Sequence, residues 1–298
     1  MKPANMIWIN GKIANINRAS FFNFHQGLNY GACVYEGIRC YDSKNGQVIF
    51  RLREHFDRFL FSASVLRMHF DVNVTEIEEA IKKLLRVNKI KSGYIRPMAF
   101  YSEPKMGINI FNSNITFMIL VWPWKDNEAM SPARLYITKY KRLDPESVDL
   151  KAKISGYYAN SLLGFIDAKE AGYDQPLFLD RAGYIAEGAV NNIFVVKKGI
   201  LYTPTKRNIL GGVTRDTVMQ LAKDLKITVV EKDMRPNFLK AADGVFLTGT
   251  GIQLQPVSEV AKYFKSSGKS EITQMIGGQY KQAALGNLPK FHKWLTRV

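Results

Sequence analysis

Apolar positions in the first third of the chain predict a series of strands followed by a helix. Short runs rich in β-branched and aromatic residues are typical of strands, and they occupy residues 6–9, 12–16, 33–42 and 47–52. The Asn-Gly pair at 10–11 separates the first two runs and predicts a hairpin turn. Farther along, apolar residues recur at helical spacing over residues 53–66, at positions Phe56, Phe59, Leu60 and Ala63.

A second helix is predicted over residues 75–88. Thr75 and Glu78 have the spacing of a capping box. One face of this helix is apolar and consists of Ile77, Ile81, Leu84 and Leu85. Strand-like segments at 93–101 and 115–124 follow, so this part of the chain has the content of one mixed domain.

The polar stretch 124–132 contains Pro132, lacks apolar periodicity and is the best candidate for an interdomain linker. Strands are predicted after it at 134–140, 176–180, 192–196, 200–204, 227–230 and 244–250. Helices are predicted at 160–172, 214–226, 238–242 and 271–285. Because 298 residues exceed what one core usually serves, we expect an α+β (mixed α/β) fold with a small domain at 1–123 and a larger one at 133–298.

Composition excludes several classes of protein. The hydrophobic content of 46% is that of a globular chain, and the first 16 residues lack the long apolar core of a signal peptide. The longest apolar run, 115–124, is far shorter than the roughly 20 residues that span a bilayer. We therefore expect a cytoplasmic protein that does not enter a membrane. Cys33 and Cys40 do not suggest a disulfide scaffold, and the four scattered histidines predict no metal site.

The net charge of +16 raises the alternative of a basic nucleic-acid-binding protein. A binding arm would gather its basic residues in one stretch. Here they are spread along the chain, as in the pairs Lys82 and Lys83, Lys197 and Lys198, and Lys262 and Lys265. The distribution therefore argues against this alternative.

Three small groups in the second half of the chain suit an anionic aromatic cofactor. Glycines at 211–212 precede a predicted helix whose first turn contains Thr214, which suits a phosphate, although the same residues also make an ordinary helix start. Residues 248–251, Thr-Gly-Thr-Gly, offer further hydroxyls and amides. Glu187 precedes a strand expected to be buried, so its carboxylate needs a partner, either a protonated pyridine nitrogen or an arginine.

With Lys153 placed before them, these groups form an ordered series that resembles the class IV aminotransferases, which are fold-type IV pyridoxal-phosphate enzymes. The resemblance extends over nearly the whole chain and is strongest to the branched-chain amino-acid aminotransferases. It rests on NYGACVYEGIRCYD, FRLREHFDRFLFSA, SGYIRPMAF, AKISGYYANSLL, EGAVNNIFVVKKGILYTP and ILGGVTRDT. It implies transamination of Leu, Ile and Val with 2-oxoglutarate, by a two-domain enzyme whose larger domain binds pyridoxal 5'-phosphate.

The resemblance also assigns cofactor-binding residues. Lys153 is identified as the catalytic lysine that carries the cofactor and moves the substrate's Cα proton. Glu187 would face the pyridine nitrogen, and Tyr158 would hydrogen-bond the phenolic oxygen. The phosphate would be held by Arg58, Gly212, Val213, Thr214 and Thr250.

For the substrate, the resemblance places Tyr94 and the amides of Thr250 and Gly251 on the α-carboxylate. Arg96 resembles the residue that receives the distal carboxylate of glutamate. The side-chain pocket would consist of Tyr30, Tyr35, Gly37, Ile108 and Trp124. Ile108 would reach in from a second subunit, which implies at least a homodimer.

The chain departs from the family wording at three places: Tyr157, the pair Val190 and Asn191, and the segment after Trp124. These departures affect the expected substrate range more than the chemistry. Two related activities on the same scaffold therefore stay open, D-amino-acid aminotransferase and aminodeoxychorismate lyase.

Overall fold

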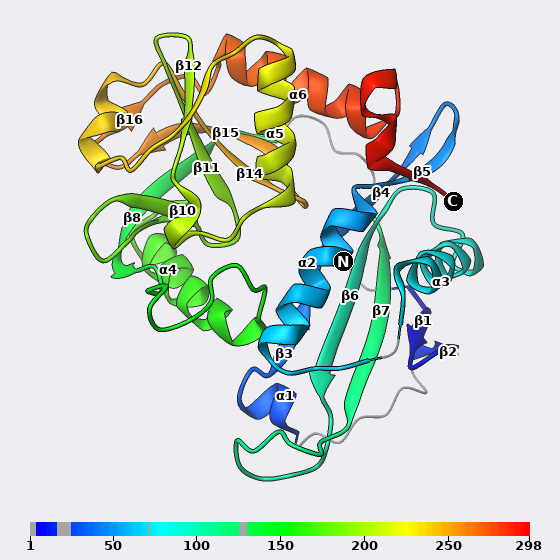
Figure 1. Cartoon of the computed structure of the whole chain (residues 1–298). Coiled ribbons are helices and arrows are strands. Elements are labelled where there is room, and N and C mark those ends of the chain that lie inside the picture. Colours follow the sequence, from blue (N-terminus) through cyan, green and yellow to red (C-terminus); the bar gives the residue numbers. More distant parts are fainter. Residues whose placement is uncertain (1–3, 17–24, 71, 125–129) are drawn as a thin grey trace. The chain divides into compact units, whose positions relative to one another are not determined.

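The computed structural model describes residues 4–16, 25–70, 72–124 and 130–298 and divides the chain into two compact units (Figure 1). Unit 1 consists of Met1–Asp126, Ala152–Tyr157 and Ala283–Val298, and unit 2 of Asn127–Lys151 and Tyr158–Gln282. The division between 126 and 127 falls in the expected linker, of which residues 125–129 lie outside the described residues. The units are nevertheless not the continuous ranges 1–123 and 133–298, because two later segments pack with unit 1.

Unit 1 contains an eight-stranded sheet. Seven strands follow the order β17-β5-β4-β6-β7-β1-β2, and β3 pairs with β6. The strands are β1 (Met6–Ile9), β2 (Lys12–Asn15), β3 (Cys33–Tyr35), β4 (Ile38–Ser43), β5 (Gly46–Phe50), β6 (Gly93–Tyr101), β7 (Ile115–Pro123) and β17 (Leu295–Arg297). The expected hairpin is confirmed, because β1 and β2 pair antiparallel across Asn10 and Gly11, which both have positive φ.

The helices of unit 1 are α1 (Gln26–Asn29), α2 (Leu52–Val65) and α3 (Val74–Val87). The predicted apolar face of α3 is confirmed, because Ile77, Ile81, Leu84 and Leu85 are all buried. The predicted capping box is wrong by two residues. Asn73 is the N-cap, and its side chain and that of Glu76 cap each other's backbone amides. Asparagine caps at least as well as threonine, so the helix begins at the earlier of the two matching patterns.

Unit 2 contains a nine-stranded sheet of order β10-β9-β8-β15-β14-β11-β12-β13, with β16 paired to β15. Its strands are β8 (Ala133–Lys141), β9 (Gln175–Leu179), β10 (Ile185–Gly188), β11 (Asn192–Lys197), β12 (Ile200–Thr203), β13 (Val229–Glu231), β14 (Gly244–Gly249), β15 (Gln253–Val260) and β16 (Phe264–Lys265). Its helices are α4 (Tyr158–Glu170), α5 (Val213–Asp224) and α6 (Glu271–Ala284). The expected helix at 238–242 is instead a 3-10 turn at Pro236–Ala241.

Each unit has its own apolar core. In unit 1, α2 and α3 pack on the sheet around Phe56, Phe59, Ile81 and Ile95. In unit 2, α5 and α6 cover one face of the sheet around Phe194 and Phe246, and the other face packs around Leu177, Ile193 and Leu247. The mixed α/β architecture predicted from the sequence is therefore present in both units.

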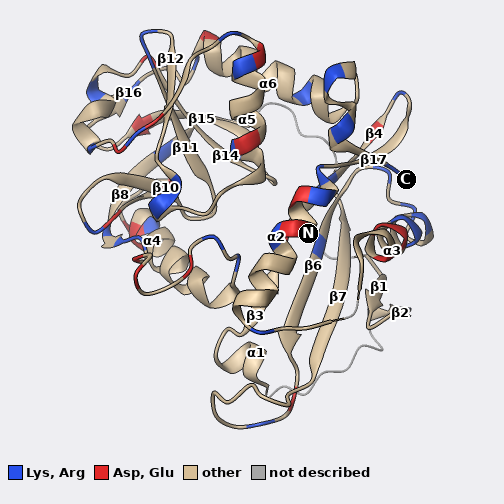
Figure 2. Ribbon diagram, viewed as in Figure 1, with Lys and Arg blue, Asp and Glu red and all other residues tan. Residues whose placement is uncertain are grey.

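Basic side chains are distributed over both units. Figure 2 shows Lys and Arg on helices, strands and loops of each rather than on one element. Within the described ranges, the helices lack the length and apolar content that a membrane span requires.

Candidate active site

Lys153 is held in unit 1 through its backbone. Its amide donates to Ser62 Oγ at 2.8 Å, and its carbonyl accepts from the amide of Tyr35 at 3.3 Å. The next residue, Ile154, forms an antiparallel bridge with Val34. Lys153 is therefore fixed between β3 and α2, and its half-buried side chain places Nζ 4.7 Å from the centre of the Tyr35 ring.

Lys153 is one end of a connected array of aromatic and basic side chains in unit 1. The Arg96 guanidinium lies 4.7 Å from the Tyr35 ring and donates through Nη2 to Tyr94 Oη at 2.7 Å. The Tyr94 and Trp124 rings are 5.5 Å apart. Tyr94 and Arg96 alternate along β6 and therefore point to the same face of the sheet, away from Ile95 in the core. The structure thus brings together five residues predicted for the site.

Gly37 lies directly beneath Tyr94 in this array. A Cβ at position 37 would lie 2.0 Å from Tyr94 Oη and 2.7 Å from Cζ. A glycine is therefore required here for the tyrosine hydroxyl to reach its observed position beside Arg96.

Gly37→Ala is expected to displace Tyr94 and to weaken substrate binding. The KM for an amino-acid substrate of the kind that the resemblance implies should rise by about tenfold or more, with a smaller change in kcat, because the resemblance predicts a binding rather than a reacting role for the displaced hydroxyl. Steady-state kinetics measure both constants. Gly277→Ala in α6 is the matched control, because its added Cβ meets nothing within 4 Å. An unchanged KM for Gly37→Ala would contradict the assignment of Tyr94.

Two further predicted pocket residues lie outside this array. Tyr30 is 48% exposed, and Ile108 is 79% exposed beside the equally exposed Met106. The loop that carries Ile108 is anchored by the buried Gln26, whose amide donates to the carbonyls of Gly107 and Asn109 at 3.1 and 2.7 Å. Ile108 is therefore presented outward on a fixed loop, and its contact with a second subunit stays a prediction.

A buried charged cluster beside Lys153 was not predicted from the sequence. Glu36 lies between β3 and β4, which splits the continuous strand expected at 33–42. Its carboxylate accepts from Arg58 Nε at 2.6 Å and from His55 Nδ1 at 2.8 Å. Burial alone would raise the pKa of the Glu36 carboxyl, but the Arg58 charge and the hydrogen bonds from His55 and Arg58 hold this pKa well below its usual range. Arg58, predicted to bind phosphate, is therefore paired with a carboxylate.

Glu187 in unit 2 has the arginine partner that the sequence left open. Arg142 Nε donates to Glu187 Oε1 at 2.8 Å, and both side chains are nearly buried. Asn192 donates to the second oxygen at 3.0 Å, and the Leu210 amide donates to Oε1 at 3.3 Å. The carboxylate of Glu187 is therefore fixed by donors from three different segments of unit 2.

Apart from Arg58 and Tyr94, the residues predicted around the phosphate and the substrate carboxylate lie in unit 2. Gly212 is the N-cap of α5, and Val213 and Thr214 are buried in its first turn. A Cβ on Gly212 would lie 2.1 Å from Asn192 Oδ1, so a glycine is required at this helix start. Thr250 and Gly251, both half-buried, follow the end of β14, and Tyr158, also half-buried, begins α4.

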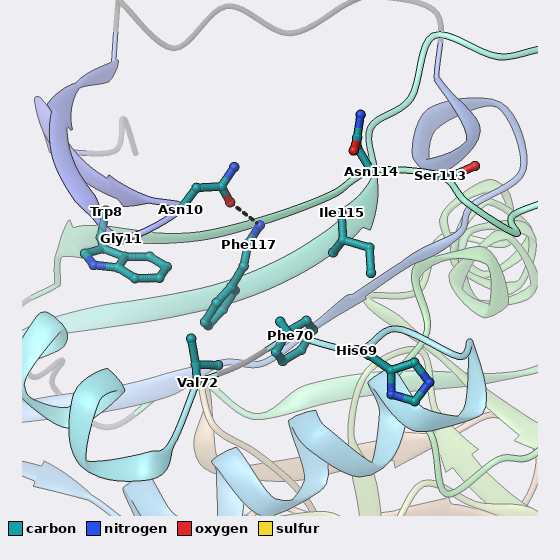
Figure 3. A pocket seen from close by; sticks show the side chains of 10 residues that line it. All are labelled: Trp8, Asn10, Gly11, His69, Phe70, Val72, Ser113, Asn114, Ile115 and Phe117. Atoms are coloured by element: carbon teal, nitrogen blue, oxygen red, sulfur yellow. Dashed lines mark hydrogen bonds between the residues drawn. The ribbon is translucent and has the colours of Figure 1, made fainter.

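A separate pocket in unit 1 contains none of the predicted site residues (Figure 3). It is lined by aromatic and polar side chains that include Trp8, His69, Phe70 and Phe117. Asn10 closes one side through a hydrogen bond to the amide of Phe117 at 2.9 Å. The pocket therefore lies apart from the Lys153 array.

Comparison with known proteins supports the resemblance noted in the sequence. The family described as amino-transferase class IV matches residues 33–260. The chain belongs to this family. A protein of Salmonella typhimurium named branched-chain-amino-acid aminotransferase is 38% identical to this chain. The alignment covers 100% of this chain and 98% of the relative.

Solved branched-chain amino acid aminotransferases have the same fold. A branched-chain amino acid aminotransferase from T.th., complexed with N-(5'-phosphopyridoxyl)-L-glutamate, has a TM-score of 0.93 and 37% identity. The same enzyme complexed with 4-methylvaleric acid has a TM-score of 0.94 and 37% identity. Both alignments cover 99% of this chain and 98% of the other, so the fold-type IV architecture is confirmed.

The departures from the class IV wording are accommodated locally. Tyr157 packs against the core of unit 1, and Asn191 is buried, with its side-chain amide donating to Gln175 at 3.4 Å. Val190 is 60% exposed. The part of the segment after Trp124 that includes residues 125–129 lies outside the described residues. Asn192, which keeps the family residue, is the one that contacts Glu187.

Proposed function

We propose that this chain transfers the amino group of branched-chain L-amino acids to 2-oxoglutarate, with pyridoxal 5'-phosphate as cofactor. The full-length similarity to enzymes named branched-chain amino acid aminotransferase carries this proposal. The products are the branched 2-oxo acids and L-glutamate. The phosphopyridoxyl-glutamate complex of the T.th. enzyme supports glutamate as the second amino acid.

The residues present fit this cofactor chemically. Lys153 offers a primary amine, and Glu187 offers a buried carboxylate for a protonated nitrogen. The Gly212-led start of α5 suits a phosphate, because no side chain of the cap residue occupies the first turn. Thr248, close in sequence to Thr250, adds a buried hydroxyl whose oxygen has no partner among the described residues. We propose the phosphate role for Arg58, Gly212, Val213, Thr214 and Thr250.

The bound cofactor supplies an electron-accepting ring that stabilises the charge left when the substrate's Cα–H bond breaks. In our proposal Lys153 carries the cofactor and then holds and returns the Cα proton through its Nζ atom. Glu187 keeps the pyridine nitrogen protonated, and Tyr158 donates a hydrogen bond to the phenolic oxygen.

Substrate recognition is proposed for the Lys153 array and for the end of β14. Tyr94, Thr250 and Gly251 bind the α-carboxylate, and Arg96 binds the distal carboxylate of glutamate. Tyr30, Tyr35, Gly37, Ile108 and Trp124 surround the side chain. An apolar wall of this kind separates side chains by only about 1 to 3 kcal/mol per methylene, so Leu, Ile and Val should all be substrates.

The decisive test is to incubate the pure holoenzyme with L-valine and 2-oxoglutarate and to measure L-glutamate. Glutamate formation supports the proposal, and its absence with cofactor bound rejects the substrate. A panel of L- and D-amino donors and aminodeoxychorismate separates the two related activities, D-amino-acid aminotransferase and aminodeoxychorismate lyase.

We also propose a homodimer or a higher homo-oligomer, because Ile108 and its exposed neighbours are presented on an anchored loop. Sedimentation of the active enzyme measures the assembly, and an active monomer would contradict this. A cytoplasmic location and the absence of nucleic-acid and membrane partners stay predictions from the sequence.

A further inference from the structure

The carboxylate of Glu36 has no role in the reaction as proposed, yet it is fully buried. Its oxygens accept from Arg58 Nε at 2.6 Å, Arg58 Nη2 at 2.8 Å and His55 Nδ1 at 2.8 Å. The amide of Gly37 donates to the same carboxylate at 3.2 Å. Four hydrogen bonds therefore fix the carboxylate, and two of them come from one guanidinium.

The cluster contains one cation and one anion. Burial lowers the pKa of the His55 imidazole, so this ring is neutral at neutral pH and donates its Nδ1–H to Glu36. A buried ion pair of this kind contributes little net stability, because desolvation offsets the attraction. What the pair does provide is a fixed geometry for Arg58.

That geometry determines where Arg58 can bind an anion. The guanidinium is planar, and its Nε and Nη2 atoms both face Glu36 in a two-point contact. The plane of the group is therefore fixed, and the Nη1 atom is directed away from the carboxylate. A single-point contact would leave the group free to rotate.

The same cluster is connected to Lys153 by two routes. Ser62 Oγ accepts from the Lys153 amide and donates to the carbonyl of Arg58, both at 2.8 Å. Tyr35, the residue before Glu36, donates its amide to the Lys153 carbonyl at 3.3 Å. The two residues expected to hold opposite ends of the cofactor are thus joined through buried contacts within one unit.

We propose that Glu36 is a positioning residue. It fixes the Arg58 guanidinium so that this group binds the cofactor's phosphate at a fixed distance from Lys153. His55 supports Glu36 from the other side. This inference rests on the phosphate role proposed for Arg58.

Charge and positioning predict opposite effects of removing Glu36. A carboxylate near a phosphate repels it, so if only charge mattered, Glu36→Gln would tighten cofactor binding. If Glu36 positions Arg58, the same substitution weakens binding, because the guanidinium loses its two-point partner. The sign of the change therefore distinguishes the two.

The experiment compares pyridoxal 5'-phosphate with pyridoxal, which lacks the phosphate. Full-length protein freed of cofactor is titrated with each, and the visible absorbance of the bound form gives Kd. Glu36→Gln and Glu36→Asp should both raise the Kd of the phosphorylated form by about tenfold and that of pyridoxal by less than about twofold. In Glu36→Asp the charge is kept and only the reach is lost.

Glu54→Gln is the matched control. Glu54 lies at the start of the same helix and forms an ion pair with Arg51, with 2.7 Å between Arg51 Nε and Glu54 Oε1. The Arg51 side chain is only 6% exposed. The Kd ratio is the Kd of pyridoxal 5'-phosphate divided by the Kd of pyridoxal. Glu54→Gln should leave this ratio unchanged. Melting temperatures of all variants are measured in parallel. If Glu36→Gln does not fold, Glu36→Asp and His55→Gln still test the proposal. His55→Gln removes the histidine but keeps the ion pair between Glu36 and Arg58, so it should raise the Kd ratio less than the Glu36 variants do.

Two results would overturn the proposal in distinguishable ways. If Arg58→Gln raises the Kd ratio but neither Glu36 variant does, Glu36 does not position Arg58. If Arg58→Gln itself leaves the ratio unchanged, the phosphate role of Arg58 is wrong, and the inference is rejected with it. Support requires in addition that the Glu36→Gln/Arg58→Gln double variant binds pyridoxal 5'-phosphate no more weakly than Arg58→Gln alone.

Discussion

Replacing Lys153 with alanine is expected to lower the rate of valine transamination by about 10³-fold or more. The ε-amine is the one group in our proposal that both carries the cofactor and moves the Cα proton. Its backbone is fixed by Ser62 and Tyr35, so the substitution removes the amine without freeing the segment. Glutamate formation from 2-oxoglutarate measures the rate.

Lys151→Ala is the matched control for this prediction. Lys151 is exposed, lies two residues earlier and carries the same charge. Its replacement should leave the rate unchanged and so separates the loss of this amine from a loss of positive charge. Borohydride reduction followed by peptide mapping should place the cofactor on Lys153. A Lys153→Ala enzyme as fast as the parent, or labelling of another lysine, would refute the proposed chemistry.

Glu187→Gln is expected to lower kcat by about 10²- to 10³-fold, because the ring nitrogen loses the negative charge that keeps it protonated. The substitution also leaves Arg142 buried without a carboxylate. That loss destabilises the fold by about 3 to 5 kcal/mol, the usual effect of breaking a buried pair. Steady-state kinetics at saturating cofactor and thermal unfolding measure the two effects separately.

Glu231→Gln separates stability from catalysis. Glu231 accepts from Arg215 Nη2 at 2.9 Å, and Arg215 is also a buried arginine of unit 2. Its loss should lower the melting temperature with little change in kcat, because Glu231 has no proposed contact with the cofactor. If the two variants lose kcat equally, the effect of Glu187 is structural and its role at the pyridine nitrogen is wrong.

Much of the fold could be predicted because local pattern and tertiary environment agree. The Asn-Gly hairpin and the apolar face of α3 depend on residues close in sequence, and both are present. The segment β6 was predicted with its observed bounds from its strand-forming residues, and its buried and half-buried positions alternate from Gly93 to Met98. The residues within each of these elements are therefore sufficient to predict it.

Strand β15 could not be predicted in this way. It is polar, half-buried and contains Pro256, which normally argues against a central strand. It is nevertheless placed between β14 and β8, and its pairing with β8 begins at Val257, just after the proline. Only the neighbouring strands make this segment a strand, and that information is absent from the local sequence.

Some residues of the candidate site could likewise be predicted from the sequence, and others could not. Lys153, Glu187 and the glycines before α5 could be found because their order along the chain matches the family. Glu36, His55 and Ser62 could not, because their importance arises from contacts across 19 to 91 positions. A buried glutamate next to Gly37 has no distinctive pattern until the fold brings Arg58 against it.

The return of the last segment to unit 1 has a consequence for how this protein is made. Strand β17 pairs with β5, and the Trp294 carbonyl accepts from the amide of Arg51, just before the helix that carries Arg58. During synthesis the N-terminus of a chain emerges first, and the N-terminal parts of the chain generally fold first. Residues 283–298 emerge after every residue of unit 2, so the sheet that begins synthesis first is the one completed last.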